Sequence, residues 1–294
     1  MKGGKMDMYA VRTLRSQPLR LMLTIGGVAL CIILMFFLFA VYRGAADGSV
    51  EYIRQNRTDL WVLQRNATNI LRGSSLVSAS QGGKIQKISG VKSISPVLFV
   101  LAAIQKGERD RTVFLTGFDP EKNIGGPPRL VTGRNVSSDN EIVLDRSFAA
   151  KFKFKVGDDV EIQEHSLKVV GISAGTNAFV IQYAFVSVRF LQGMIGFPGI
   201  ATCYMVEVED KNFLPEIAGK IRNELPRLEA YDHETFLANN IYEMKSGFLP
   251  LLYTVAAIGG VVLTVILSLL LTVNILERRK DFPQQIFVYT KIPA

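Results

Sequence analysis

A dense run of charged side chains directly follows a long uncharged stretch of the sequence, residues 246–276. Ammonium, guanidinium and carboxylate groups at the end of an apolar helix can form ion pairs with a soluble protein, or they can anchor the helix at the inner membrane surface. In the first case the run would be part of a rigid helical lever that seats on a cytoplasmic partner. Both interpretations stay open on the residues alone. The candidate contact residues are Glu277, Arg278, Arg279 and Lys280.

Side chains that usually carry catalysis or bind metals are isolated in the sequence. The two histidines, His165 and His233, lie near no cysteine and far from each other, so a zinc site is not expected. Cys31 falls in an apolar segment and Cys203 in an external strand, which excludes a disulfide between them. No G-x-x-x-x-G-K-[ST] motif is present, and GGKIQ at 82–86 has neither its spacing nor its Ser or Thr. The sequence therefore predicts no catalytic, cofactor-binding or metal-binding residue, and no ATP hydrolysis by this chain.

Two apolar segments must position the charged run. No Asp, Glu, Lys, Arg or His occurs in residues 21–42 or 246–276. A helix needs about 20 apolar residues to cross a hydrocarbon core of about 30 Å, so both segments are long enough. We predict transmembrane helices over residues 21–43 and 246–276. A cleaved signal peptide is the alternative for the first segment, with Ala45-Ala46 as its cleavage site, but such peptides carry a shorter apolar core.

The basic side chains indicate how these helices are oriented. Residues 1–20 and 277–294 together carry nine basic and three acidic side chains, a net charge of +6, which leaves only +2 of the total +8 for the long middle segment. Short flanks rich in Lys and Arg stay cytoplasmic. We therefore predict a cytoplasmic N-terminal amphipathic segment (1–20), an external domain (44–245) and a cytoplasmic charged tail (277–294). The positive charge thus follows from membrane topology, and no base-reading or stacking motif supports nucleic-acid binding.

The apolar segments contain no ionisable side chain that could relay an ion. Proton and ion pathways through a bilayer usually need buried carboxylates, His or Arg, and two apolar helices cannot enclose a polar pathway unaided. This argues against a secondary transporter and favours a helix pair that holds an external domain and transmits its movement. Ala256 and Gly260 stand four residues apart, the spacing of small residues that lets helices pack closely, and they are the candidate helix-packing pair.

The external domain has the pattern of a mixed α and β fold. Residues 59–64 (DLWVLQ) form a β-rich run, and Ile85 and Ile88 then mark a helix that stops at Gly90 before a new strand. The same order recurs in residues 203–209, 212–225 and 227–231. Two strand–helix–strand units separated by a long insertion predict a ferredoxin-like (porter-like) layer with an inserted small β-rich subdomain at about 130–200. The predicted fold class is an α+β membrane protein.

The insertion carries its own strand and helix signals. Residues 141–144 predict a strand, Asp145 a helix N-cap, and the residues after it a short helix with Phe148 and Phe152 on its buried side. Gly157-Asp158 then predicts a turn into a β-hairpin. Large aromatic side chains are readily buried. Three of them are therefore predicted as core rather than as ligand contacts: Trp61, Phe148 and Phe152.

Several stretches resemble a known family. Residues 13–30 (TLRSQPLRLMLTIGGVAL) resemble the first membrane segment of the FtsX-like permeases of ABC transporters. Residues 274–282 (NILERRKDF) resemble the charged segment after the second membrane helix of that family. The block VGDDVEI followed by VVGI is the most specific part of the likeness, which runs from about Thr13 to Phe282. Three stretches resemble the MacB-type periplasmic core domain: 125–135, 140–162 and 167–172.

The resemblance implies a permease subunit of a mechanotransmission-type ABC transporter in a bacterial inner membrane, with both termini cytoplasmic. In such systems a separate cytoplasmic ATPase binds ATP and drives movements of the external domain through two permease chains. The expected partners are therefore this ATPase, a second permease chain, membrane lipids and a periplasmic adaptor protein. The chain itself needs no cofactor. It would export or extract a hydrophobic or lipid-like substrate, and Glu277 to Lys280 would lead into the ATPase contact.

The end of the sequence departs from the family pattern. The family has four membrane helices, whereas Pro283 is predicted to interrupt the helix here, because its ring clashes with the previous turn and removes a donor. The expectation is the N-terminal part of such a permease, truncated after the second membrane helix. Two alternatives share the same topology and stay open: a two-helix sensory receptor and a regulator of periplasmic enzymes.

The charge distribution makes the orientation testable. A cysteine introduced at Lys106 is expected to react with an impermeant thiol reagent in intact cells, because the middle segment lies outside. A cysteine introduced at Lys5 is expected to stay unlabelled, because the basic flank lies inside. Labelling at residue 5 without labelling at residue 106 would invert the topology.

Overall fold

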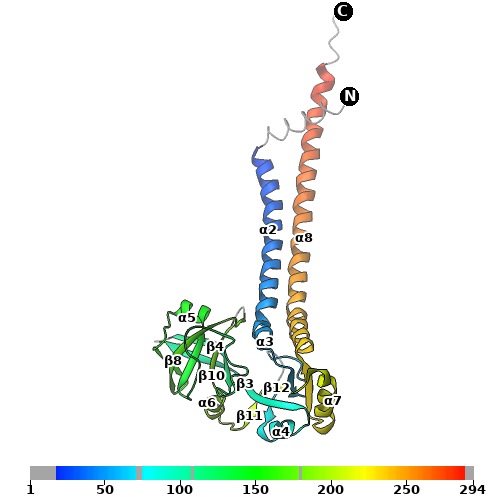
Figure 1. The fold of residues 1–294 in the computed structure, drawn as a ribbon. Coiled ribbons are helices and arrows are strands. Elements are labelled where there is room, and N and C mark those ends of the chain that lie inside the picture. The colour runs from blue at the N-terminus through cyan, green and yellow to red at the C-terminus, as the bar shows by residue number, and fades with distance from the viewer. Residues whose placement is uncertain (1–17, 71–74, 107–108, 179–180, 289–294) are drawn as a thin grey trace, which may run out of the picture. The chain divides into compact units, whose positions relative to one another are not determined.

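The computed structural model describes residues 18–70, 75–106, 109–178 and 181–288. The chain divides into two compact units. One unit runs to Tyr42 and resumes at Gly247, and the other extends from Arg43 to Ser246. The strands and the shorter helices all belong to the second unit (Figure 1).

Two long helices, α2 (Pro18–Ser49) and α8 (His233–Val288), contain the apolar segments. Proline favours the first turn of a helix, because its fixed φ angle fits there and no amide hydrogen is needed. By length and composition, Ile25–Ala45 of α2 and His233–Ile266 of α8 are able to cross a membrane. Many of their large apolar side chains are exposed, which matches a helix surrounded by lipid.

Hydroxyl groups within α8 are satisfied by the helix itself. Thr254, Thr264 and Thr272 each donate to the carbonyl oxygen four residues earlier, at 2.8 Å in all three cases. A hydrocarbon environment offers no water to a hydroxyl, so these internal bonds remove much of the penalty for a polar side chain there. The threonines are therefore compatible with a membrane-spanning helix.

The prediction that Pro283 interrupts the second long helix is wrong. α8 continues through Pro283 and ends at Val288. A proline within a helix costs about 3 kcal/mol, but it removes a single backbone bond. An existing helix extends without the cost of a new nucleus, so the residues on both sides can remain helical. Pro250 lies within the same unbroken helix.

One layer of the second unit is a four-stranded antiparallel sheet in the spatial order β13-β1-β12-β3. Along the chain, β1 is followed by α4 and β3, and β12 is followed by α7 and β13. Ile85 of α4 and Ile217 and Ile221 of α7 share one core, so both helices cover the same face of the sheet. The bounds are β1 Leu60–Gln64, α4 Ala79–Ile85, β3 Val91–Lys106, β12 Cys203–Val208, α7 Leu214–Glu224 and β13 Leu228–Asp232.

Alternate side chains of β1 enter two different cores. Leu60 and Val62 pack in the core under α4 and α7, whereas Trp61 and Leu63 belong to the core on the opposite face. Successive side chains of a strand point to opposite faces, so a continuous apolar run is needed where both faces are covered. The prediction of Trp61 as a core residue is confirmed, since its side chain is 0% exposed.

Strand β3 belongs to a second group of strands as well. Residues up to Val97 pair with β12, and residues from Leu98 onward pair with β4. The order then continues β4-β10-β6-β8, and β7 pairs with both β8 and β3, which closes a ring of strands. β5 lies outside the ring on β8. The bounds are β4 Arg109–Phe118, β5 Arg129–Gly133, β6 Glu141–Asp145, β7 Asp159–Ile162, β8 His165–Ala174 and β10 Ile181–Ser187.

The ring, with β5, α5 (Arg146–Phe152) and α6 (Val188–Met194), forms the β-rich lobe. Its core is apolar, and α5 packs on it through Phe148, which is 1% exposed, and Phe152, which is partly buried. Asp145 caps α5 by accepting the Ser147 N–H at 2.7 Å, so the predicted N-cap is confirmed. The lobe also uses residues 98–106 and 109–118, ahead of the predicted range of 130–200, because β3 and β4 complete the ring.

Short elements connect the lobe and the layer. Val50 alone separates α2 from α3. Ser78 starts α4 with a capping box, in which it accepts from the Gln81 N–H and the Gln81 side chain accepts from the Ser78 N–H. The bounds are α3 Glu51–Gln55, β2 Val77–Ser78, β9 Asn177–Ala178, β11 Ile200–Ala201 and η1 Lys211–Phe213, with β2 paired to β11 and β9 to β10.

A bidentate ion pair joins Arg134, which follows β5, to Glu141, the first residue of β6. Arg134 donates to both carboxylate oxygens of Glu141, one of them at 2.7 Å, and the Ser137 N–H adds a third bond at 2.8 Å. The hydrogen bonds from Arg134 lower the pKa of Glu141 from 4.5 to about 2, although burial acts in the opposite direction. The ionised form of Glu141 therefore stabilises the lobe.

The second unit is expected to fold without the membrane helices, because its three apolar cores lie entirely between Tyr52 and Phe236. We predict that residues 48–244 express as a soluble monomer with one cooperative thermal transition in calorimetry. An aggregate or a broad, non-cooperative melt would contradict a self-contained domain.

The Glu141→Gln variant of this domain is expected to lose about 2 kcal/mol of unfolding free energy at pH 7, because the charged hydrogen bonds are weakened. In the unchanged domain the folded pKa lies below the ordinary one, so the contribution is complete above 4.5 and disappears as the pH falls through about 2. Urea unfolding between pH 2 and pH 7 measures both effects.

The matched control for this measurement is Glu207→Gln. Glu207 faces Lys92 at 3.9 Å in an exposed pair, and such pairs contribute less than about 1 kcal/mol. The control should keep the acid-dependent loss of stability that Glu141→Gln removes. The assignment to Glu141 fails if both variants show the same dependence on pH as the unchanged domain.

Candidate functional site

Five of the aromatic side chains in one large core connect α3, the antiparallel layer, the β-rich lobe and the start of α8. They share one buried core with apolar neighbours. Phe99 is partly buried, and the side chains of Tyr52, Trp61 and Phe236 are 0% exposed. We call this cluster the aromatic joint. Its members are Tyr52 of α3, Trp61 of β1, Phe99 of β3, Tyr183 of β10 and Phe236 of α8.

Tyr52 connects α3 with the β-rich lobe. Its ring stacks on Tyr183, with 4.9 Å between centroids and 10° between planes, and makes an edge contact with Phe99 at 5.4 Å. Its hydroxyl donates to the carbonyl oxygen of Gly125 at 2.7 Å. Burial raises the pKa of Tyr52 well above its ordinary value of 10.0, so the hydroxyl remains a donor.

Gly125 is needed for this contact. Its φ angle is +82°, and a Cβ atom built there would lie 2.4 Å from the Val97 side chain. Only glycine adopts this backbone conformation freely and leaves room for the neighbouring side chain. The loop after β4 can therefore approach the Tyr52 hydroxyl closely enough to accept its hydrogen bond.

Trp61 connects the layer with α8. Its ring stacks on Phe236, with 4.7 Å between centroids and 22° between planes, and makes an edge contact with Tyr52 at 6.5 Å. Such aromatic pairs contribute about 0.5–1.5 kcal/mol beyond the burial of their area. The buried Nε1–H of Trp61 has no hydrogen-bond partner among the described residues, so packing alone sets its position.

Asn240 holds α8 one turn beyond Phe236. Its amide nitrogen donates to the Phe236 carbonyl oxygen at 2.8 Å, and its amide oxygen accepts the Ile70 N–H at 3.1 Å. The residue is 6% exposed, and a buried amide is costly unless it is hydrogen-bonded. A rotation of the first turns of α8 would break the bond to Ile70, so Asn240 favours one rotational position at the start of the helix.

Both long helices lead into the joint within a few residues. α2 ends at Ser49, and Tyr52 is the second residue of α3. α8 carries Phe236 in its first turn and continues without a break to Val288. Protein interiors are close-packed and resist compression. A displacement of Phe236 would therefore require Trp61 and its neighbours to repack.

Cys203 lies in the same core and is 0% exposed. Burial raises the pKa of its thiol, so the reactive thiolate is not formed at neutral pH. Cys31 and Cys203 are both free thiols. Among the described residues, no group of three or more His, Cys, Asp or Glu side chains is arranged to hold a metal ion.

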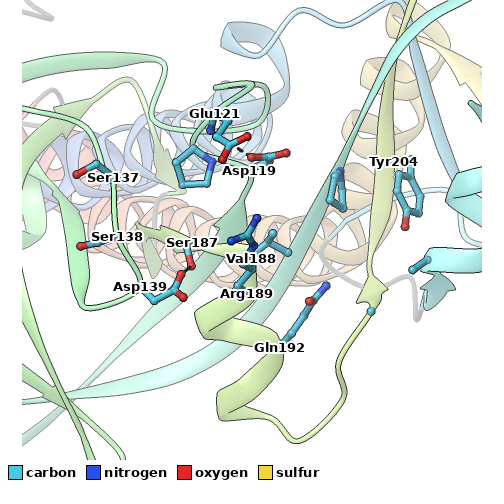
Figure 2. A pocket seen from close by; sticks show the side chains of 14 residues that line it. Asp119, Glu121, Ser137, Ser138, Asp139, Ser187, Val188, Arg189, Gln192 and Tyr204 are labelled. Atoms are coloured by element: carbon cyan, nitrogen blue, oxygen red, sulfur yellow. Dashed lines mark hydrogen bonds between the residues drawn. The ribbon is translucent and has the colours of Figure 1, made fainter.

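A cleft of about 320 Å³ lies between the layer and the β-rich lobe (Figure 2). Pro96 and Tyr204 line it from the layer, and Ser187 and Arg189 line it from the lobe. The Ser187 hydroxyl caps α6 and donates to Asp139, so it serves as a structural group. The cleft lies beside β3, the strand that the layer and the lobe share.

The residues proposed from the sequence lie along α8. The structure describes only the backbone at Glu277, Arg278, Arg279 and Lys280, where it is helical, and their contact with a partner stays a prediction. Ala256 and Gly260 are exposed, and a Cβ atom built on Gly260 would meet nothing within 4 Å. Their role in helix packing also stays a prediction.

The sequence did not reveal the joint as a site. Trp61 was expected in the core, but Tyr52, Tyr183 and Phe236 lie far apart in the chain and only the fold brings them together. One signal was available. Tyr52 follows the first apolar segment and Phe236 precedes the second, so each is a large aromatic residue placed close to a membrane helix.

Comparison with known proteins gives a family match. The family model described as the MacB-like periplasmic core domain matches residues 21–224. The periplasmic region of MacB from Actinobacillus actinomycetemcomitans is 14% identical, with a TM-score of 0.48 over 62% of this chain and 92% of that one. The extracellular domain of the noncanonic ABC-type transporter YknZ from Gram-positive bacteria is 13% identical, with a TM-score of 0.46 over 60% of this chain and 100% of that one. No curated protein sequence matches this chain.

Proposed function

Because this chain belongs to the ABC transporter permeases with a MacB-like periplasmic core domain, we propose that it transmits movement between an external domain and a separate cytoplasmic ATPase. The observation that carries the proposal is the stacking of Phe236 on Trp61 in the first turn of an unbroken α8. A helix that starts in a packed domain core and continues through an apolar stretch is a mechanical connection.

The direction of transmission follows from the joint. A shift of α8 displaces Phe236, and stacking passes the displacement to Trp61 and then to Tyr52. Tyr52 contacts Tyr183 of β10 and the loop after β4, so the β-rich lobe receives the movement. Asn240 prevents the helix from turning without the domain. The two helices would therefore reorient the layer and the lobe together.

The ATPase is assigned to a partner because the chain has no G-x-x-x-x-G-K-[ST] motif. Glu277, Arg278, Arg279 and Lys280 are proposed as the segment that leads into its contact, since they continue α8 beyond the apolar stretch.

A second permease chain, a periplasmic adaptor and membrane lipids complete the proposed assembly. We assign both termini to the cytoplasm and the strands to the outer side of the inner membrane. The proposed substrate is hydrophobic or lipid-like, and it is exported or extracted.

We also propose that the antiparallel layer is ferredoxin-like and that the β-rich lobe is inserted into it. The order β13-β1-β12-β3 supports this. The first strands of the two strand–helix–strand units, β1 and β12, lie in the centre, and the second strands, β3 and β13, lie at the edges, as in a ferredoxin-like fold. β4 to β11 lie in the chain between the two units. An insertion at the end of β3 would place the lobe directly against the joint.

The joint can be tested by using the full chain to capture an ATPase subunit and measuring ATP hydrolysis by the captured complex. Phe236→Leu is expected to retain the captured ATPase, because residues 277–280 are unchanged, and to lower the permease-dependent part of ATP hydrolysis about fivefold. That factor corresponds to the loss of about 1 kcal/mol of aromatic packing. The measured quantity is the rate with the permease minus the rate of the ATPase alone.

Tyr242→Phe is the matched control, because Tyr242 lies on the same helix, also carries an aromatic ring and is 71% exposed. It should leave both capture and hydrolysis unchanged. A chain in which Glu277, Arg278, Arg279 and Lys280 are all alanine should lose capture. The proposal is wrong if the unchanged chain captures no ATP-binding protein, or if Phe236→Leu, shown to be folded by its thermal transition, hydrolyses ATP at the unchanged rate.

A further inference from the structure

One end of the ring of strands in the β-rich lobe lies next to α3. Glu51 and Gln55 of α3 line a groove of about 500 Å³ together with Asp145 and Ala174, the last residues of β6 and β8. A Cβ atom built on Gly175 would lie 3.7 Å from the Gln55 side chain, so the chain after β8 is close to α3.

The strand directions bring further segments to this end of the ring. β10 is antiparallel to β6, so β10 starts here, and β4 is parallel to β10, so β4 starts here as well. α5 follows β6 directly and therefore also begins at this end. α6 follows the end of β10 and lies at the opposite end of the ring (Figure 1).

This end of the lobe is close to the point where the chain leaves the apolar stretch of α2. Ala45 is the last residue of the segment that is able to cross a membrane by length and composition, and it belongs to the second unit. Glu51 follows it by six positions, about 9 Å along a helix. Headgroups extend about 5–7 Å beyond the hydrocarbon core on each side of a bilayer. The groove at Glu51 would therefore border the headgroup layer of a membrane that α2 crosses.

Cationic side chains gather at the same end of the lobe. Residues 146–157 carry four basic side chains and no acidic one. Arg111 near the start of β4 and Lys151 of α5 both lie against the ring of Phe152, with their charged groups 4.8 Å and 5.4 Å from its centroid. Two arginines line the groove beside α3. We call these cations the basic rim, and its members are Arg111, Arg129, Arg146 and Lys151.

The carboxylates at this end do not neutralise the basic rim. Asp145 is 2% exposed and is used by the fold, because it caps α5 and accepts from the Thr176 hydroxyl at 3.0 Å. Glu51 and Asp110 are further acidic residues here, and among the described residues neither forms an ion pair with the rim. Glu108 lies outside the described residues. Three more acidic residues follow along the chain, before β7 and in it: Asp158, Asp159 and Glu161.

We infer that the basic rim docks on the surface of an anionic bilayer and holds the β-rich lobe next to the membrane. Cations are attracted by the potential of an anionic membrane, which falls off over about 8 Å at physiological ionic strength. A guanidinium group can also donate two parallel hydrogen bonds to a lipid phosphate. Arg111 and Lys151 already rest on Phe152, so they lose little freedom on docking. This surface is separate from the aromatic joint and from the proposed ATPase contact.

The contact can be measured in the full chain reconstituted in lipid nanodiscs without an ATPase. A bimane probe on Ala150→Cys reports the position of α5, because Ala150 is exposed and precedes Lys151. Cys31→Ala removes another thiol that could be labelled, and Cys203 is buried. Lipids with a nitroxide on the headgroup quench a probe that reaches the membrane surface. We expect quenching in nanodiscs of three parts phosphatidylcholine to one part phosphatidylglycerol, and much less in phosphatidylcholine alone.

The variant with Arg129→Gln, Arg146→Gln and Lys151→Gln tests the basic rim. Docking should weaken about a hundredfold, at roughly fivefold for each cation near an anionic surface, so the quenching should fall to the level seen in phosphatidylcholine. Salt at about 1 M should have the same effect on the probe in the chain with an intact rim, because the screening length is then about 3 Å. This salt dependence also decides the matter if the triple variant does not fold.

The matched control removes three exposed cations from α4 and the residues after it, by Lys84→Gln, Lys87→Gln and Lys92→Gln. α4 covers the face of the layer opposite to the aromatic joint, so this variant should keep the quenching at residue 150. A probe on Gly83→Cys of α4, where a Cβ atom meets nothing within 4 Å, should stay unquenched.

The inference is overturned if phosphatidylglycerol or salt leaves the quenching at residue 150 unchanged. It is also overturned if the control variant lowers that quenching as much as the rim variant does, or if the probe on α5 is quenched no more than the probe on α4. The assay contains no ATPase, so a failure of the proposed coupling would not alter these results.

Discussion

The packing of Phe236 against Trp61 is the contact on which the rest of the structure depends. It lies in the first turn of α8, a helix that begins in a protein core and continues through an apolar stretch without a break. The side chains of such a helix must suit two environments. At its start they pack closely against other side chains, and further along they face an apolar solvent. Asn240 marks the change, because it is the last buried residue in the described part of α8. The described side chains of α8 beyond that point are exposed or partly buried.

The shared strand β3 limits how the external domain can respond. It pairs with β12 in its first half and with β4 in its second, so the layer and the lobe are parts of one continuous sheet. The loop after β4 adds three hydrogen bonds back to the layer and α3: Lys122 to the Ile94 carbonyl oxygen at 2.7 Å, Ser95 to that of Ile124 at 3.3 Å, and Tyr52 to that of Gly125 at 2.7 Å. A free hinge is therefore absent between these described elements. Twisting of the sheet, with opening or closing of the cleft in Figure 2, is the movement that keeps these bonds.

Patterns among neighbouring residues predicted most helices and strands of the external domain. They did not predict contacts between residues far apart in the sequence. The β-rich run at 59–64, the Asp145 cap and the helix expected within 212–225 each depend on neighbours within a few residues, and the structure has all three. The ring of the β-rich lobe depends on β7 pairing with β3, whose residues lie more than fifty positions earlier, and no local pattern records that contact. The joint was missed for the same reason. Pro283 was misjudged because the local cost of proline is smaller than the tendency of an existing helix to continue.

The chemistry of the joint determines the conditions under which it can work. Its contacts are aromatic packing and one hydrogen bond from a neutral hydroxyl, and burial keeps that hydroxyl neutral because it raises the pKa of Tyr52. Packing of neutral groups is not screened by salt, whereas exposed ion pairs are. The pair of Arg134 and Glu141 lies outside this core, so that pair responds to the medium while the joint does not. The aromatic packing is therefore expected to respond less to acidity and ionic strength than the exposed ion pairs of the same domain do.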